Sequence, residues 1–124
     1  MATKQKRPVF LNLFQMKFPP TAIVSILHRI TGVILFLGLP FLLYILQQST
    51  CSFDRFITIF PLNVGFKFLM WVIGSSALYH LCAGIRHLVM DMGWGESLSQ
   101  ARITAYITLV LLVLIIIGMG VWLW

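Results

Sequence analysis

Residues Phe68–Met90 read FLMWVIGSSALYHLCAGIRHLVM, an apolar run with one histidine, His80, near its middle. A helix needs about 20 apolar residues, at about 1.5 Å each, to cross the hydrocarbon of a bilayer, and this run is long enough. An ionisable side chain at that depth is costly, so such residues usually have a function and a partner. His80 is therefore predicted to ligate a metal or haem iron, to relay protons, or to bond another helix.

Two further apolar runs predict helices at about 22–47 and 102–124, and the central helix is expected at about 66–91. The 124 residues are 60% hydrophobic and 10% charged, whereas about a quarter of a soluble domain is charged. Only helices and closed barrels satisfy the backbone in lipid, and no period-two alternation appears. We predict an all-α membrane protein with three transmembrane helices, divided into a surface segment, 1–20, and a transmembrane domain, 21–124.

The net charge of +6 is distributed unevenly. Four Lys or Arg residues precede the first span, and Arg86 and Arg102 flank the connection between the second and third spans. The positive-inside rule therefore predicts the N-terminus inside and the C-terminus outside, and it accounts for the charge without nucleic acid. Within the first helix, Thr21 is expected to be the cap and Pro40 to cause a kink.

Small and polar residues share one face of the central helix. At about 100° per residue, an arc of about 120° contains Ser76, Ala77, His80, Ala83, Gly84, His87 and Asp91. Small residues beside a histidine allow the close approach of a flat group or of another helix. Three interpretations stay open: helix packing with one hydrogen-bonding histidine, a proton relay through His80, His87 and Asp91, or a haem site.

The first helix carries a matching face. An arc of about 100° contains Ser25, His28, Arg29 and Gly32. The two helices run in opposite directions, so His28 and Arg29 are expected at the inner surface, level with His87. This layout suits a b-type haem standing across the membrane, with His80 as iron ligand. His87, about 10.5 Å further along, and His28 or Arg29 would reach the propionates.

A low-spin haem with two histidine ligands needs a second histidine at the depth of His80. His28 and His87 are both expected near helix ends, so the second ligand is predicted to come from another chain. Ser25 and Arg29 lie one turn apart at the inner surface. A hydroxyl and a guanidinium can both donate to a carbonyl oxygen, which is what a quinone headgroup in a lipid-connected pocket requires.

Two segments of the chain resemble a known family. The run FPPTAIVSILHRITGV (Phe18–Val33) and the run ALYHLCAGIRHLVMD (Ala77–Asp91) resemble the signature segments of the cytochrome b subunit of succinate dehydrogenase, respiratory complex II. The pattern SxxHRxTG followed by HxxxGxRHLxxD is specific as a pair. The N-terminal KQKRPVFLNLFQMKF is also similar, and the resemblance covers nearly the whole chain.

The resemblance implies roles for several residues. His80 would be the axial ligand of haem b, His87, His28 and Arg29 would lie near its propionates, and Ser25 and Arg29 would contact ubiquinone. The family works beside a second three-helix anchor subunit that donates the other haem histidine. Together the two anchors hold an iron–sulfur subunit and a flavoprotein subunit on the inner side of the membrane.

The implied activity is electron transfer from succinate, through iron–sulfur clusters, to ubiquinone in the respiratory chain. This chain has no flavin motif and no cluster-binding cysteines, so it is expected to be a subunit that is not catalytic alone. The alternatives are the anchor of a quinol–fumarate reductase, or a membrane subunit without haem that relays protons or is purely structural. No Arg- and Ser-rich transit peptide is apparent, which favours a bacterial inner membrane over a mitochondrial one.

Overall fold

The computed structural model describes residues 18–59, 61 and 63–124. Along these residues lie four helices: α1 (Pro20–Cys51), α2 (Phe53–Ile59), α3 (Val64–Asp91) and α4 (Leu98–Leu123). By length and composition, α1, α3 and α4 can each cross a membrane. The prediction of an all-helical chain with three long apolar helices is therefore confirmed. Most of the proposed surface segment, 1–20, lies outside the described residues, and α2 lies in a connection for which no helix was predicted.

The helix ends follow local side-chain chemistry. Thr21 does not cap α1, so that prediction was wrong: Pro19 occupies the N-cap position and α1 begins at Pro20. Proline suits the first helical position, where Pro20 lies, because its fixed φ matches the helix and its missing N–H is not needed there. The start of α3 has an ordinary cap, since the Asn63 side chain accepts a hydrogen bond from the N–H of Phe66 at 3.1 Å.

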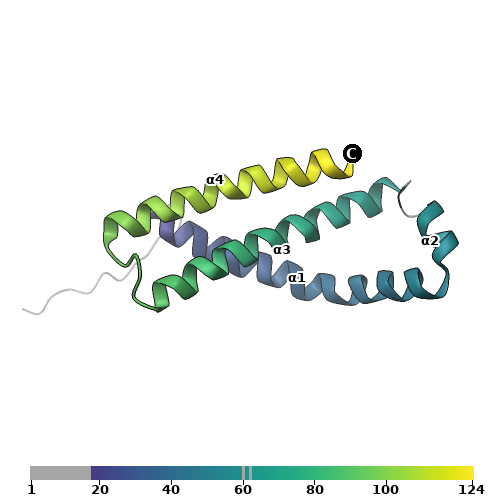
Figure 1. The fold of residues 1–124 in the computed structure, drawn as a ribbon, viewed down its shortest axis with the longest axis horizontal. Coiled ribbons are helices and arrows are strands. Elements are labelled where there is room, and N and C mark those ends of the chain that lie inside the picture. Colours follow the sequence, from purple (N-terminus) through teal and green to yellow (C-terminus); the bar gives the residue numbers. More distant parts are fainter. Residues whose placement is uncertain (1–17, 60, 62) are drawn as a thin grey trace, which may run out of the picture.

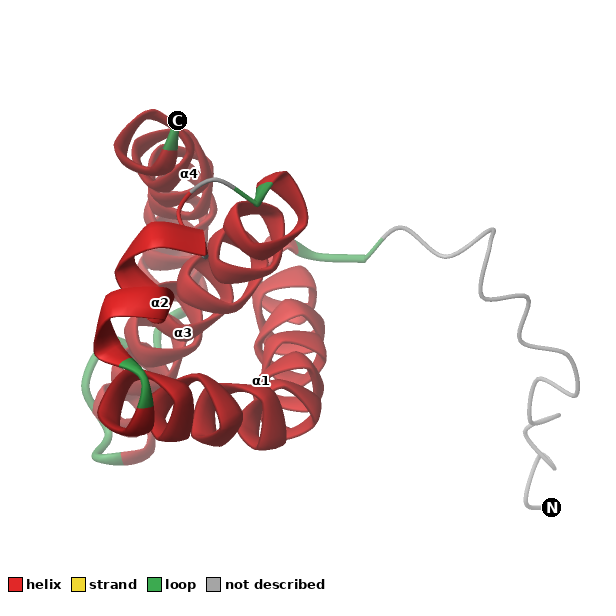
Figure 2. Cartoon of the chain, turned by 90° about the vertical axis from the view of Figure 1, so that its right-hand side faces the viewer, coloured by secondary structure: helices red, strands yellow, loops and turns green. Residues whose placement is uncertain are grey.

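Helix α3 packs against both α1 and α4, and α1 also contacts α4 (Figure 1). The view along the molecule shows that α1 changes direction partway along its length (Figure 2). Pro40 lies inside this helix, where a proline removes one backbone hydrogen bond and its ring clashes with the preceding turn. The half of α1 before the bend crosses α3, and this crossing is where the polar residues of both helices meet.

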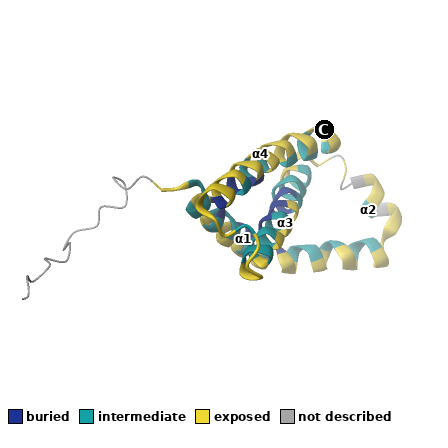
Figure 3. Ribbon diagram, turned by 60° about the vertical axis from the view of Figure 1, so that its left-hand side comes forward, coloured by how far each residue is buried: buried dark blue, intermediate teal, exposed yellow. Residues whose placement is uncertain are grey.

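The buried core is small and lies where the three long helices meet (Figure 3). Its central cluster consists of Val24 from α1, Tyr79 and Ala83 from α3, and Ala105 from α4. The Tyr79 hydroxyl donates to the Val24 carbonyl oxygen at 3.3 Å, which ties α3 to α1. Most other large apolar side chains are exposed, as suits helices whose outer surfaces face lipid or other membrane segments.

Helix α4 is joined to α3 by hydrogen bonds from two α3 side chains. Trp71 of α3 donates from its indole N–H to the Ile116 carbonyl oxygen of α4 at 2.9 Å. Arg86 of α3 donates to the Thr104 hydroxyl at 3.1 Å and to the Ala101 carbonyl oxygen at 3.0 Å. These bonds fix α4 against α3 at two separate levels.

Candidate functional site

Three histidines form a stack where α1 crosses α3. The rings of His28 and His80 have centroids 4.0 Å apart and planes 15° apart. The rings of His28 and His87 have centroids 5.2 Å apart and planes 21° apart. His28 of α1 therefore lies between two histidines of α3 that are seven residues apart in sequence. The shared location predicted for His28 and His87 is observed, but His28 also reaches His80, which was not predicted.

The deeper position of His28 has a simple cause. Because α1 begins at Pro20, His28 lies eight residues into the helix, roughly 12 Å along its axis. The parallel rings of His28 and His80 face each other, and 4.0 Å between them leaves no room for a macrocycle. A haem iron held by both histidines would need one imidazole on each side of it. His28 therefore cannot supply the second axial ligand opposite His80 in this arrangement.

The protonation of His80 follows from its hydrogen bonds. Its Nδ1 lies 3.0 Å from the carbonyl oxygen of His28 and 3.2 Å from Oγ1 of Thr31. A carbonyl oxygen only accepts, so Nδ1 must carry the hydrogen, and in a neutral imidazole Nε2 then keeps a free lone pair. Histidines that ligate metals usually donate their other ring N–H to a backbone carbonyl in this way. The donor chemistry of His80 thus fits axial ligation of an iron through Nε2.

Two glycines make room for the histidine stack. A Cβ at Gly32 of α1 would lie 3.0 Å from Cε1 of His80, closer than side chains normally approach. A Cβ at Gly84 of α3 would lie 3.3 Å from Nε2 of His28. Each helix therefore presents a glycine to the imidazole of the other. The small residues predicted to allow a close approach do so here for the chain's own histidines.

His87 has the same tautomer as His80. Its Nδ1 lies 2.7 Å from the Ala83 carbonyl oxygen, one turn back in α3, so Nδ1 donates and Nε2 is left with a lone pair. Arg86 does not join this group, although it is next to His87 in the sequence. Its guanidinium is held by α4 instead, because it lies on the face of α3 that packs against that helix.

Ser25 and Arg29 lie four residues apart on α1, so they are neighbours on one face of the helix. Ser25 is half-buried and Arg29 is exposed. Within the part of the chain that the structure describes, neither side chain forms a hydrogen bond or an ion pair. Both donors are therefore available to a group from outside the chain: Ser25 lies about one turn before His28, and Arg29 directly follows it.

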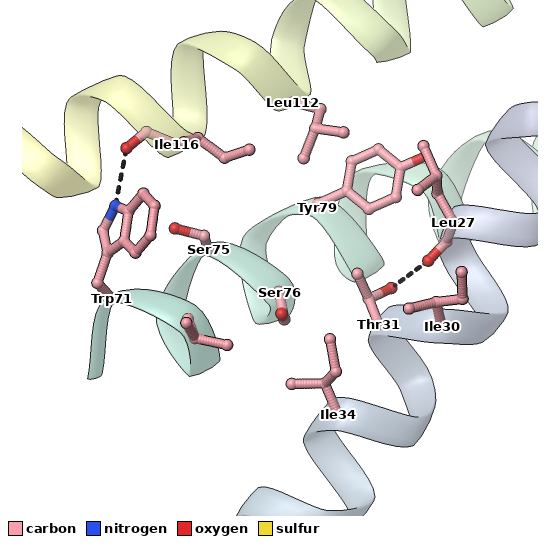
Figure 4. Close-up of a pocket in the computed structure, with 11 residues that line it drawn as sticks. Leu27, Ile30, Thr31, Ile34, Trp71, Ser75, Ser76, Tyr79, Leu112 and Ile116 are labelled. Atoms are coloured by element: carbon pink, nitrogen blue, oxygen red, sulfur yellow. Dashed lines mark hydrogen bonds between the residues drawn. The ribbon is translucent and has the colours of Figure 1, made fainter. Parts of the chain in front are cut away.

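A cavity of about 270 Å³ lies between α1, α3 and α4 (Figure 4). Apolar side chains and Tyr79 line most of it, with Thr31 at one side and Trp71 at the other. Ser75 also lines it, and its Oγ is buried with no hydrogen-bond partner among the described residues. No sequence pattern predicts this cavity, because it depends on the spacing of three helices.

Taken together, the fold and the site define an all-helical chain with three potential membrane spans and a polar histidine cluster between the first two. A family model for the succinate dehydrogenase/fumarate reductase transmembrane subunit matches residues 3–119. The chain therefore belongs to this family, as its sequence resemblance predicts.

Individual relatives agree with the family assignment. The chain is 45% identical over 122 residues to the succinate dehydrogenase cytochrome b556 subunit of Coxiella burnetii, covering 96% of this chain and 98% of that protein. It is 34% identical over 110 residues to the b556 subunit of Rickettsia felis, covering 89% and 87%. It is 36% identical over 110 residues to the succinate dehydrogenase cytochrome b560 subunit of Reclinomonas americana, covering 83% and 76%.

Proposed function

We propose that this chain binds haem b through His80 and forms part of a ubiquinone-reducing site in a succinate dehydrogenase complex. The observation that carries the proposal is the hydrogen bond of His80 Nδ1 to the His28 carbonyl oxygen, which leaves Nε2 free to ligate iron. The names of the relatives, cytochromes b of succinate dehydrogenase, support the same cofactor and the direction of succinate oxidation. The chain is then a subunit that has no activity alone.

The haem would be held by this chain on one side only. His80 would supply one ligand nitrogen, and a second three-helix anchor subunit would supply the other, since His28 is stacked flat against His80 and is not placed to do so. His87, through its free Nε2, and His28 or Arg29 are the candidates for the propionates. When bound, haem b supplies a one-electron redox centre inside the membrane.

The quinone would be bound by Ser25 and Arg29. Both are donors without a partner in the described structure, and both lie on the α1 face beside His28. A hydroxyl and a charged guanidinium donating to one carbonyl oxygen would orient the headgroup and stabilise negative charge as that oxygen is reduced. The remaining wall of this pocket would come from the partner subunits.

The proposed topology rests on the charge distribution, and the proposed partners are those that the family resemblance implies. With the N-terminus inside and the C-terminus outside, His87, Arg29 and the connection between α3 and α4 lie on the inner side. The surface segment, 1–20, and this connection would contact the iron–sulfur subunit, which with the flavoprotein subunit would lie at the same surface. We place the complex in a bacterial inner membrane.

A proton relay is the rival function, and the geometry favours it less. A relay requires neighbouring imidazoles to meet through N–H edges, whereas His28 and His80 meet face to face. The Nδ1 protons of His80 and His87 are also donated to backbone carbonyl oxygens, which do not pass a proton onward.

An absorbance spectrum of the purified four-subunit complex tests the proposal. We expect haem b only when the second anchor subunit is coexpressed, and His80→Ala should abolish the low-spin spectrum. His87→Ala is the matched control on the same helix face and should keep a low-spin haem. An unchanged low-spin spectrum in the His80→Ala complex would show that the axial ligand lies elsewhere.

A further inference from the structure

We infer that Thr31 is a positioning residue for His80. The Thr31 hydroxyl oxygen and the His28 carbonyl oxygen both accept a hydrogen bond from the Nδ1–H of His80. These two acceptors set the orientation of the imidazole and its electron donation toward the haem iron. The inference rests on the proposed function, because it assigns His80 as the iron ligand. Thr31 lies on α1, whereas the proposed iron ligand, His80, lies on α3.

The hydrogen-bond geometry around Thr31 permits one consistent assignment. Oγ1 of Thr31 lies 2.9 Å from the carbonyl oxygens of both Leu27 and His28, one turn back in α1. The hydroxyl has a single hydrogen, which it must donate to one of these carbonyls. Its lone pairs then face His80 Nδ1 at 3.2 Å, so Thr31 acts there as an acceptor. The Nδ1 proton is shared between two oxygens of α1.

The surroundings hold this arrangement in place. Thr31 is only 8% exposed, so water does not compete freely for its hydroxyl. The next residue, Gly32, leaves space for Cε1 of His80, where a Cβ would come within 3.0 Å. Thr31 therefore binds the Nδ1 edge of the imidazole, and Gly32 leaves room for the ring. These contacts restrict the rotation of the His80 ring.

When Thr31 accepts a hydrogen bond from Nδ1–H, the His80 imidazole becomes a stronger electron-pair donor at Nε2. A stronger donor favours ferric over ferrous iron and so lowers the reduction potential of the haem. Partners of this kind typically change metal affinity by about 10- to 100-fold. If affinity is lost mainly for ferric iron, each ten-fold loss raises the haem reduction potential by about 59 mV, because the couple transfers one electron.

The chain contains a matched control for an ordinary helical threonine. Thr108 of α4 is 7% exposed, close to the value for Thr31, and its hydroxyl donates to the Thr104 carbonyl oxygen at 2.8 Å. It has the usual bond to its own helix, with no histidine contact among the described residues. Replacing Thr108 with valine removes the same atoms from a buried helix without touching His80.

The test uses the whole complex, with both anchor subunits and both peripheral subunits. Thr31→Val, Thr31→Ser and Thr108→Val are compared by haem content, low-spin EPR signal and haem midpoint potential. We expect Thr31→Val to raise the potential by tens of millivolts, about 59 mV for each ten-fold loss of ferric affinity, and to shift the EPR signal. Thr31→Ser, which keeps the hydroxyl, should restore wild-type values, and Thr108→Val should leave them unchanged.

Failure of the inference can be told apart from failure of the proposed function. If His80→Ala loses the low-spin haem but Thr31→Val has a wild-type potential and EPR signal, then His80 is the ligand and Thr31 does not position it. If His80→Ala keeps the low-spin haem, the proposed function itself is wrong. Should Thr31→Val fail to assemble, Thr31→Ala and Thr31→Ser are compared, and equal potentials in these two would overturn the inference.

Discussion

The imidazole of His28 on α1 lies flat against that of His80 on α3, so each ring buries one face of the other. This contact fills the space on one side of His80 and leaves the Nε2 edge as the direction in which the ring can bind a ligand. It also joins the two helices that carry the proposed haem and quinone residues. The site therefore depends on contacts between helices as well as on the identity of its polar residues.

Replacing His28 should separate its stacking role from a propionate contact. His28→Phe keeps a flat ring against His80, whereas His28→Ala removes it. Stacked aromatic pairs contribute about 0.5–1.5 kcal/mol, so His28→Ala should weaken haem retention by roughly two- to ten-fold. His28→Phe should retain haem better than His28→Ala, as measured by haem per complex after detergent washing. Equal losses in the two variants would instead assign His28 to a polar contact.

Adding a methyl group at Gly32 should displace His80. The new Cβ would come within 3.0 Å of Cε1 of His80, and overpacking of this kind typically costs about 1–3 kcal/mol. We expect Gly32→Ala to lower the low-spin haem content of the complex. Gly118→Ala on α4 is the control, since a Cβ there meets nothing within 4 Å. Equal haem content in the two variants would contradict the close approach of α1 and His80.

The quinone proposal predicts a selective loss of activity. Ser25→Ala and Arg29→Leu should impair ubiquinone reduction while succinate oxidation with an artificial electron acceptor stays nearly normal. A lost hydrogen bond costs about 0.5–1.5 kcal/mol for a neutral pair and about 1.5–3 kcal/mol for a charged one, so Arg29→Leu should be the worse variant, by roughly ten-fold or more in kcat/KM for quinone.

Ser49→Ala is a matched control for the serine. Ser49 also lies on α1, and its hydroxyl donates to the Leu46 carbonyl oxygen within the same helix. Its quinone kinetics should equal those of the wild type. Normal quinone kinetics in both Ser25→Ala and Arg29→Leu would mean that the headgroup is bound by other residues.

A native cysteine allows the orientation to be measured. Cys51 is exposed and lies at the end of α1 that is predicted to be outside. A membrane-impermeant maleimide should label Cys51 in intact spheroplasts, and Cys51→Ser should abolish this labelling. A cysteine introduced as Glu96→Cys, in the Cys51→Ser background, should react only in inverted vesicles. The reverse pattern would place the N-terminus outside and refute the proposed topology.

The sequence predicts the spans and the candidate residues better than it predicts their contacts. Three apolar runs require three helices in lipid, and the mid-span position of His80 follows from counting residues. The stack of His28 on His80 depends on where α1 begins and how it crosses α3, which periodicity does not determine. Thr31 stands in the pattern SxxHRxTG, but its contact with His80 was not predicted, because a threonine in a membrane helix ordinarily bonds its own backbone.

The bond from His80 to α1 joins residues 52 positions apart, and this separation has a consequence for biogenesis. The ribosome releases α1 well before α3, so the imidazole of His80 has no fixed orientation until the two helices have met in the bilayer. If His80 ligates the haem iron as proposed, cofactor loading through Nε2 would depend on correct pairing of α1 and α3. A chain in which α1 and α3 had not paired correctly would leave His80 without a fixed orientation for binding iron. Such a chain would differ from a mature subunit by lacking the absorbance of haem.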